Sequence, residues 1–197
     1  MKTVNVISYF VVLLITVNVH AQKLKFEVTS GNLSFLKEVE KLKIVYYYSG
    51  LMVGEMVESD YITKRMMEED LKNPTGGEIW LIKWKDDRSD YYEPKFEELW
   101  NKYLIKIPAG KDMESDVNMI VHTTWIEPGF STGIMGYGSR PSLINLTIKF
   151  TKNGNETAVV KITNSPGGGS YYAAERIGES YAKAAKTLAG YVLRAIK

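Results

Sequence analysis

The sequence predicts one mixed α/β domain of the α+β kind, with a largely antiparallel sheet of about four strands, packed helices and a long C-terminal helix. Two patterns predict this fold class. Alternating apolar and polar residues indicate strands in both halves of the chain, and apolar residues spaced by three or four indicate helices. The composition agrees, because 197 residues that are 45% hydrophobic and 24% charged are typical of one globular domain.

The first 21 residues are predicted to be a secretory signal peptide. Lys2 precedes an apolar stretch from about Val4 to Val19, and the small residue Ala21 offers a cleavage position. Polar residues interrupt the stretch, so it suits a membrane anchor less well, although a retained anchor stays an alternative. We therefore expect an exported protein, in the periplasm or at the cell surface, whose residues 22–197 form one domain without a membrane span.

The first half of the mature chain predicts one strand and three helices. Residues 22–40 show no clear pattern beyond one helical turn at Ser34–Glu38, and alternation from residue 42 then predicts a strand. Ser59 is a candidate N-cap, and Trp80 and Trp84 lie on one helical stripe. Pro94 suits the first turn of a further helix. The expected elements are the strand 42–48 and the helices 59–73, 78–90 and 94–103.

The second half predicts three strands and the closing helix. Alternation predicts strands over 117–125, 143–152 and 158–163. Asn153-Gly154 is expected to form a type I′ hairpin turn, because both residues tolerate positive φ. From Tyr172 to Ile196 the apolar residues step by three or four, which predicts a long amphipathic helix.

Composition excludes several classes of function. The chain has no cysteine, which rules out disulfides, thiolate metal sites and a lipid anchor on cysteine. A net charge of +2 gives no footprint for nucleic acid. His122 is the one histidine left after signal cleavage, and no catalytic, metal or phosphate-binding motif is present. We expect no catalytic residue, metal or cofactor.

Two sets of residues are candidates for binding. Aromatic residues exceed what one small core hides, and they include the pairs Tyr91-Tyr92 and Tyr171-Tyr172. The Gly-rich run before the closing helix offers free backbone amides to an anion, although a flexible turn is the simpler interpretation. The predicted aromatic contacts are Trp80, Trp84, Tyr92, Trp125 and Tyr137, and the predicted anion contacts are Gly168, Gly169 and Ser170.

The chain also resembles known envelope proteins. Its second half has a strand ending in Glu127-Pro128-Gly129-Phe130, a Gly-rich loop, two paired strands, the turn Gly167-Gly168-Gly169 and an Ala-rich helix. This order resembles uncharacterised bacterial envelope domains similar to the N-terminal domain of TolB. The stretch from Asp86 to Leu99 resembles exported proteins of unknown function from Bacteroidetes-like bacteria. The resemblance implies an α/β envelope module that acts by binding.

We therefore expect a non-enzymatic envelope module whose aromatic, glycine-bearing edge contacts another envelope protein or a glycan. Two alternatives stay open. The chain is an exported hydrolase if His122 or a carboxylate pair assembled across the fold acts on a substrate. It is a structural subunit if its exposed surfaces join copies of itself into a homo-oligomer.

Overall fold

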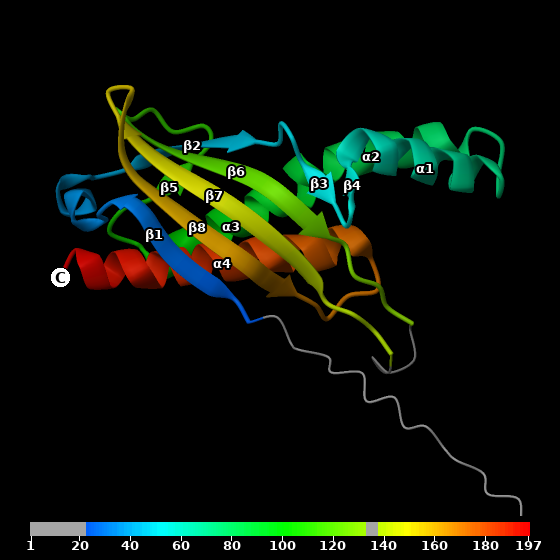
Figure 1. Cartoon of the computed structure of the whole chain (residues 1–197). Helices are drawn as coiled ribbons and strands as arrows, with labels where there is room; N and C mark the ends of the chain where they lie inside the picture. The colour runs from blue at the N-terminus through cyan, green and yellow to red at the C-terminus, as the bar shows by residue number, and fades with distance from the viewer. Residues whose placement is uncertain (1–22, 133–137) are drawn as a thin grey trace, which may run out of the picture.

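A computed structural model describes residues 23–132 and 138–197. The expected signal peptide and Tyr137 lie outside these residues. One mixed sheet joins the strands β1 (Lys25–Gly31), β8 (Asn155–Gly167), β7 (Ser142–Lys152), β6 (Val117–Glu127), β2 (Leu42–Tyr47) and β5 (Ala109–Gly110) in that order. Two helices, α3 (Glu93–Tyr103) and α4 (Ala173–Ala195), run across one of its faces (Figure 1). The predicted mixed α/β class, largely antiparallel sheet and long C-terminal helix are confirmed. The sheet has eight strands rather than about four, because three two-residue strands and one edge strand add to it.

Three long antiparallel strands form the centre of the sheet: β6 (Val117–Glu127), β7 (Ser142–Lys152) and β8 (Asn155–Gly167). Each is longer than its expected range. Asn153 and Gly154 have φ of 50° and 82°, as a type I′ turn requires, so the predicted hairpin is confirmed. The long hairpin carries the end of β8 and the start of β7 to the same rim of the sheet.

The N-terminal segment contributes two strands. β1 (Lys25–Gly31) pairs with the outer side of β8, and a 3-10 helix, η1 (Ser34–Glu38), leads to β2 (Leu42–Tyr47). β1 was not predicted, although Phe26 and Val28 alternate with polar residues; most of its side chains are exposed at the edge of the sheet, and only Phe26 packs against the core. β2 pairs in parallel with β6 and with β5 (Ala109–Gly110).

A helical hairpin projects beyond the sheet (Figure 1). The short strands β3 (Met52–Val53) and β4 (Met56–Val57) lead into α1 (Glu58–Asp70), and α2 (Gly76–Asp87) returns beside it. A π-helical turn, η2 (Arg88–Tyr92), then joins α2 to α3 (Glu93–Tyr103), which has its proline in the first turn as predicted. The helix expected over 78–90 therefore begins earlier and ends in a π turn.

The closing helix α4 (Ala173–Ala195) packs against β7, β8 and α3. Its small residues permit this close approach: a Cβ at Gly178 would lie 3.2 Å from the carbonyl oxygen of Tyr91. The apolar stripe of α4 covers the inward side chains of the sheet, and together they form the core. No helix in the described part of the chain is both long and apolar enough to cross a membrane.

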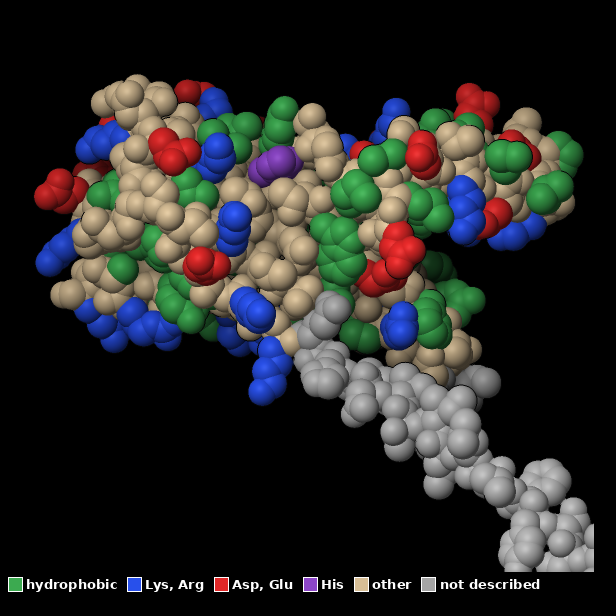
Figure 2. Space-filling model, in the orientation of Figure 1, with side chains coloured by type: hydrophobic (Ala, Val, Ile, Leu, Met, Phe, Trp, Pro, Cys, Tyr) green, Lys and Arg blue, Asp and Glu red, His purple; other side chains and the backbone are tan. Residues whose placement is uncertain are grey.

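No helix of residues 23–132 and 138–197 covers the opposite face of the sheet (Figures 1 and 2). Its side chains alternate with the buried ones and are mostly half-exposed and polar. His122, the purple side chain of Figure 2, lies on this face. Neighbours on this face are Val45 and Tyr47 on β2, Asn118, Ile120 and Thr124 on β6, and Thr147 and Lys149 on β7.

Candidate binding site

Exposed aromatic side chains gather at one rim of the sheet, around the turn Gly168–Ser170 between β8 and α4. Tyr171 and Tyr172 follow this turn and are 67% and 66% exposed, with their rings edge to face at 5.7 Å. Phe130, in the loop after β6, is 48% exposed, and Tyr91 of η2 is 38% exposed. We call these four residues the aromatic rim.

Arg176 holds the loops of the rim together. Its side chain is 5% exposed and lies on the first turn of α4. Nη1 donates to the carbonyl oxygens of Ser170 and Tyr171 at 3.1 and 2.6 Å. Nε and Nη2 donate to Pro128 at 3.4 and 3.3 Å, and Nη2 also donates to Gly129 at 3.2 Å. One guanidinium thus fixes the loop after β6 against the turn before α4.

A buried hydroxyl cluster supports the same turn from below. The Ser142 hydroxyl lies 2.6 Å from the Arg176 carbonyl oxygen and 2.8 Å from the Ser180 hydroxyl, and Ser165 donates to the carbonyl oxygen of Ser180. A Cβ at Gly167 would lie 2.1 Å from the Arg176 carbonyl oxygen, so only glycine fits where β8 meets α4. The rim therefore stands on a tightly packed base.

Two hollows flank Gly168–Ser170. The first, of about 350 Å³, lies between the turn and the loop after β6, with Phe130, Arg140 and Tyr171 in its lining and Arg176 at its base. The second, of about 500 Å³, lies on the other side of the turn, against Tyr91 and Lys95. We call them the arginine hollow and the lysine hollow.

The two hollows differ in charge. Two arginines and no carboxylate are among the described residues that line the arginine hollow. The lysine hollow carries Glu175 and Glu179 beside Lys95, and Lys95 pairs with Glu179 at 3.6 Å and with Glu98 at 3.2 Å. The carboxylates of Glu98 and Glu179 raise the pKa of Lys95. A lining with two arginines and no carboxylate, among the described residues, therefore distinguishes the arginine hollow from the lysine hollow.

The predicted anion contacts border both hollows. Gly168 and Gly169 are exposed, and nothing lies within 4 Å of where a Cβ would stand on either residue. Ser170 is half-exposed; its hydroxyl donates to the Glu175 carboxylate and accepts from the backbone N–H of Tyr172. The carboxylate of Glu175 thus lies near the start of α4. Arg140 and Lys95, which are distant in the sequence, border the hollows on either side of Gly168–Ser170. The sequence around the turn did not indicate these basic neighbours.

The predicted aromatic contacts lie elsewhere. Trp84 and Tyr92 are only 5% and 1% exposed, which corrects the expectation that they offer a surface to a ligand. Trp80 is half-buried and stacks on Trp84 at 5.7 Å, with Arg65 over its ring. Trp125 is half-exposed and donates its indole N–H to Gly54 at 2.8 Å, at the base of the helical hairpin. Tyr137 lies outside the described residues.

Sequence reasoning did not single out the aromatic rim. Tyr91, Tyr171 and Tyr172 were only part of the general aromatic excess, and Phe130 was noted only as part of a loop motif. One signal was present for two of them: Phe130 lies between Gly129 and Ser131, and Tyr171 follows Ser170, in segments without a predicted strand or helix. An aromatic residue in that setting has no core face to join.

Half-buried tyrosines of β2 and its following loop form a polar cluster with two carboxylates of α3. The hydroxyl of Tyr46 donates to the Glu93 carbonyl oxygen at 3.1 Å and to Glu97, and Tyr48 donates to Glu93 at 3.3 Å. Burial, together with these acids, raises the pKa of both tyrosines well above the usual value, so both stay neutral donors. Arg88 lies 4.2 Å over the ring of Tyr48 and pairs with Glu58. This cluster joins the helical hairpin to the sheet.

The residues of the hydrolase alternative are placed apart from the rim. His122 Nε2 lies 2.8 Å from the carbonyl oxygen of Ser49, and its ring meets Tyr47 edge to face at 5.0 Å. No hydrogen bond joins this imidazole to a carboxylate or hydroxyl of the described residues. Among the same residues, no group of three His, Asp or Glu side chains is arranged to hold a metal.

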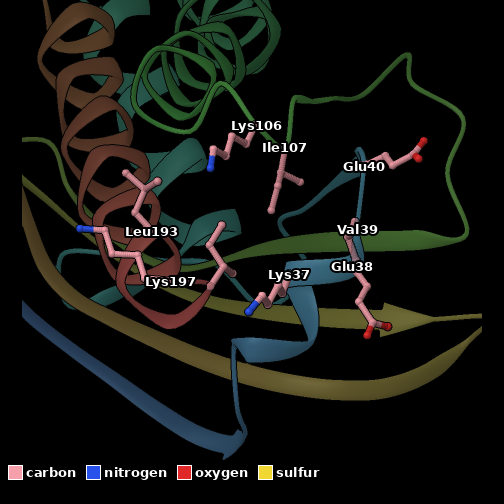
Figure 3. Close-up of a pocket in the computed structure, with 9 residues that line it drawn as sticks. Lys37, Glu38, Val39, Glu40, Lys106, Ile107, Leu193 and Lys197 are labelled. Atoms are coloured by element: carbon pink, nitrogen blue, oxygen red, sulfur yellow. The ribbon is translucent and has the colours of Figure 1, made fainter.

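A further hollow, of about 880 Å³, lies at the other end of the molecule, beside the C-terminus. Its apolar lining comes from Ile107, Leu193 and Ile196, with lysines and glutamates around it. Figure 3 shows that the carboxylates of Glu38 and Glu40 point away from Leu193. Charges of both signs and no exposed ring give this hollow no clear ligand preference.

Comparisons with known proteins assign no family. No family model and no curated protein match the sequence. Two structures of the PelC dodecamer from Paraburkholderia phytofirmans, one of them a point variant, are 12% and 11% identical to the chain, each with a TM-score of 0.39. Each alignment covers 84% of this chain and 97% of PelC. A likeness at this level carries neither a family nor a function to this chain.

Proposed function

We propose that the chain is an exported, non-enzymatic binding module of the bacterial cell envelope, and that it binds a glycan at the aromatic rim. The observation that carries this proposal is the cluster of four exposed rings around Gly168–Ser170. Ring faces stack on the C–H groups of sugars, while serines and backbone amides of the turn suit sugar hydroxyls. Arg176 holds these groups in place before a ligand arrives, which lowers the entropy lost on binding.

A glycan fits the dimensions of the site better than a partner protein does. The hollows of about 350 and 500 Å³ lie in the range of roughly 300–1,000 Å³ that small ligands occupy. A protein interface instead needs a broad apolar centre surrounded by polar residues. At the rim, polar turn residues and charged side chains lie among the rings instead.

Binding to a glycan array, followed by titration with the glycans found, tests the proposal. We expect the double variant Tyr171→Ala with Tyr172→Ala to weaken binding at least about tenfold, because stacking on both rings is lost. Tyr103→Ala is the matched control, since Tyr103 is an exposed tyrosine on α3 and not part of the rim. If the double variant binds the glycan as tightly as Tyr103→Ala does, a glycan site at the rim is rejected. It is also rejected if the protein captures an envelope protein and binds no glycan of the array.

Export is tested separately from binding. Expression of the full chain in a bacterium, followed by cell fractionation and N-terminal sequencing, is expected to give a periplasmic or surface protein that begins at Gln22. A protein that stays in the cytoplasm with Met1 intact would contradict the proposed location.

A further inference from the structure

We propose that the arginine hollow binds the carboxylate of an acidic sugar, so that the glycan recognised at the rim contains uronic acid units. This inference rests on the proposed function and names the class of glycan. The hollow brings together two cationic side chains, two aromatic rings and several hydroxyl groups, with no carboxylate among the described residues of its lining.

Arg140 supplies the direct contact. Its side chain is exposed and borders the hollow, while its backbone pairs with Phe130 on the opposite strand of the loop. No hydrogen bond or ion pair of this guanidinium with another described residue occupies its N–H groups. A guanidinium with free donors binds a carboxylate through two parallel hydrogen bonds, which fix its orientation as well as its position.

Arg176 supplies charge from beneath. Its donors are all directed at backbone carbonyl oxygens, so it is not available for a direct hydrogen bond to a ligand. The charge itself has no acidic partner within ion-pair distance in the described chain. A buried charge without a counter-ion carries a desolvation cost, and an anion in the hollow above it offsets part of that cost.

The rings decide between a sugar and a simple anion. Phe130 and Tyr171 border the same hollow as the two arginines. The face of an aromatic ring is electronegative, so it repels a bare anion and attracts the C–H groups of a pyranose. Ser139 adds a hydroxyl group that matches those of a sugar. A uronic acid carries a carboxylate, a C–H face and hydroxyl groups on one ring.

The experiment compares one oligosaccharide in two charge states. The purified protein is titrated by calorimetry with tetramers of galacturonate, glucuronate and mannuronate, and with the methyl ester of each, which removes the charge and leaves the sugar. Arg140→Gln tests the carboxylate contact. Arg194→Gln is the control, because Arg194 is an exposed arginine near the C-terminal end of α4 that lies over Tyr191.

We expect at least one uronate to bind at least about tenfold more tightly than its methyl ester. Arg140→Gln should weaken the binding of that uronate about tenfold, whereas Arg194→Gln should change it less than about twofold. Raised salt should weaken the uronate more than its ester. If the esters bind as tightly as the uronates, and the Tyr171→Ala and Tyr172→Ala double variant loses this binding, the proposal of an acidic sugar is rejected while the proposal of a glycan site stands. Equal binding of tetra-aspartate, or binding of inorganic phosphate alone, would also reject it, as would no binding of any uronate.

Discussion

Tyr92 and Tyr181 stack with their ring centroids 5.3 Å apart, yet their hydroxyl groups differ in hydrogen bonding. The Tyr181 hydroxyl pairs with Thr123, whereas the Tyr92 hydroxyl is buried and has no hydrogen-bond partner in the described part of the chain. Both rings lie between the π turn η2 and helix α4, in the core beneath the aromatic rim. A buried polar group without a partner reduces stability, while a paired one adds to it.

We therefore expect opposite effects from the same chemical change at these two positions. Tyr92→Phe removes an unpaired hydroxyl and should raise the free energy of unfolding by about 1 kcal/mol. Tyr181→Phe leaves Thr123 without its buried partner and should lower it by about 1–2 kcal/mol. Urea unfolding of both variants with an unchanged m-value measures the difference. A loss of stability in Tyr92→Phe would show that its hydroxyl has a partner in solution.

Gly167 and Gly168 are neighbours that should respond differently to alanine. A Cβ at Gly167 would meet backbone atoms at 2.1 and 2.4 Å, and backbone cannot move aside without separating β8 from α4. Gly167→Ala should therefore cost about 3 kcal/mol of stability. Gly168 has nothing within 4 Å of a Cβ, so Gly168→Ala should change stability by less than about 0.5 kcal/mol. Thermal unfolding measures both, and similar melting temperatures for the two variants would contradict this close packing.

Asp87 should make stability depend on pH. Burial, with Asp90 and Asp86 nearby, raises its pKa from 3.8 to about 6. The folded state then binds this proton more tightly than the unfolded state, so the stabilising contribution of the neutral acid is complete below about pH 4 and is lost as the pH rises through 6. Asp87→Asn should remove that loss and raise the free energy of unfolding by up to about 1 kcal/mol at pH 7. This value is small because Asp87 is partly exposed and solvent screens its charge.

Unfolding midpoints measured from pH 4 to pH 7 give the difference between the wild type and Asp87→Asn. Glu78→Gln is the matched control, because Glu78 is an exposed acid on the same helix and is not among the charges that raise the pKa of Asp87. A difference that does not change with pH, or a similar profile for both variants, would place the titrating group elsewhere.

The elements most readily predicted from sequence were those whose signal is local. Alternation located β6 and β7, and Asn153-Gly154 located the hairpin turn that joins β7 to β8. The apolar stripe located α4 to within one residue at each end. Strand β1 alternates only from Leu24 to Thr29, and this short pattern was not taken as a strand. It is held by pairing with β8, some 130 positions away in the case of Thr29 and Val159, and a partner that distant gives no local signal.

The site was harder to predict than the fold. Trp84 is buried because Tyr61 and Glu58 come from another helix to cover it, the latter accepting its indole N–H at 2.7 Å. Composition shows that some aromatic residues must be exposed, but the tertiary partners decide which. Arg140 and Arg176 likewise border one hollow only after β7 and β8 have brought the loop and the helix together.

The bonds of Arg176 also link binding to the completion of folding. Its guanidinium reaches Pro128 and Gly129, 48 and 47 positions earlier in the chain, and these bonds exist only when α4 is seated on the finished hairpin. A chain that has emerged without its last helix lacks both the floor of the hollow and the tie between its loops. Only a chain whose C-terminal helix has folded onto the sheet can therefore bind at this rim. Partly synthesised chains, and chains trimmed of α4, cannot.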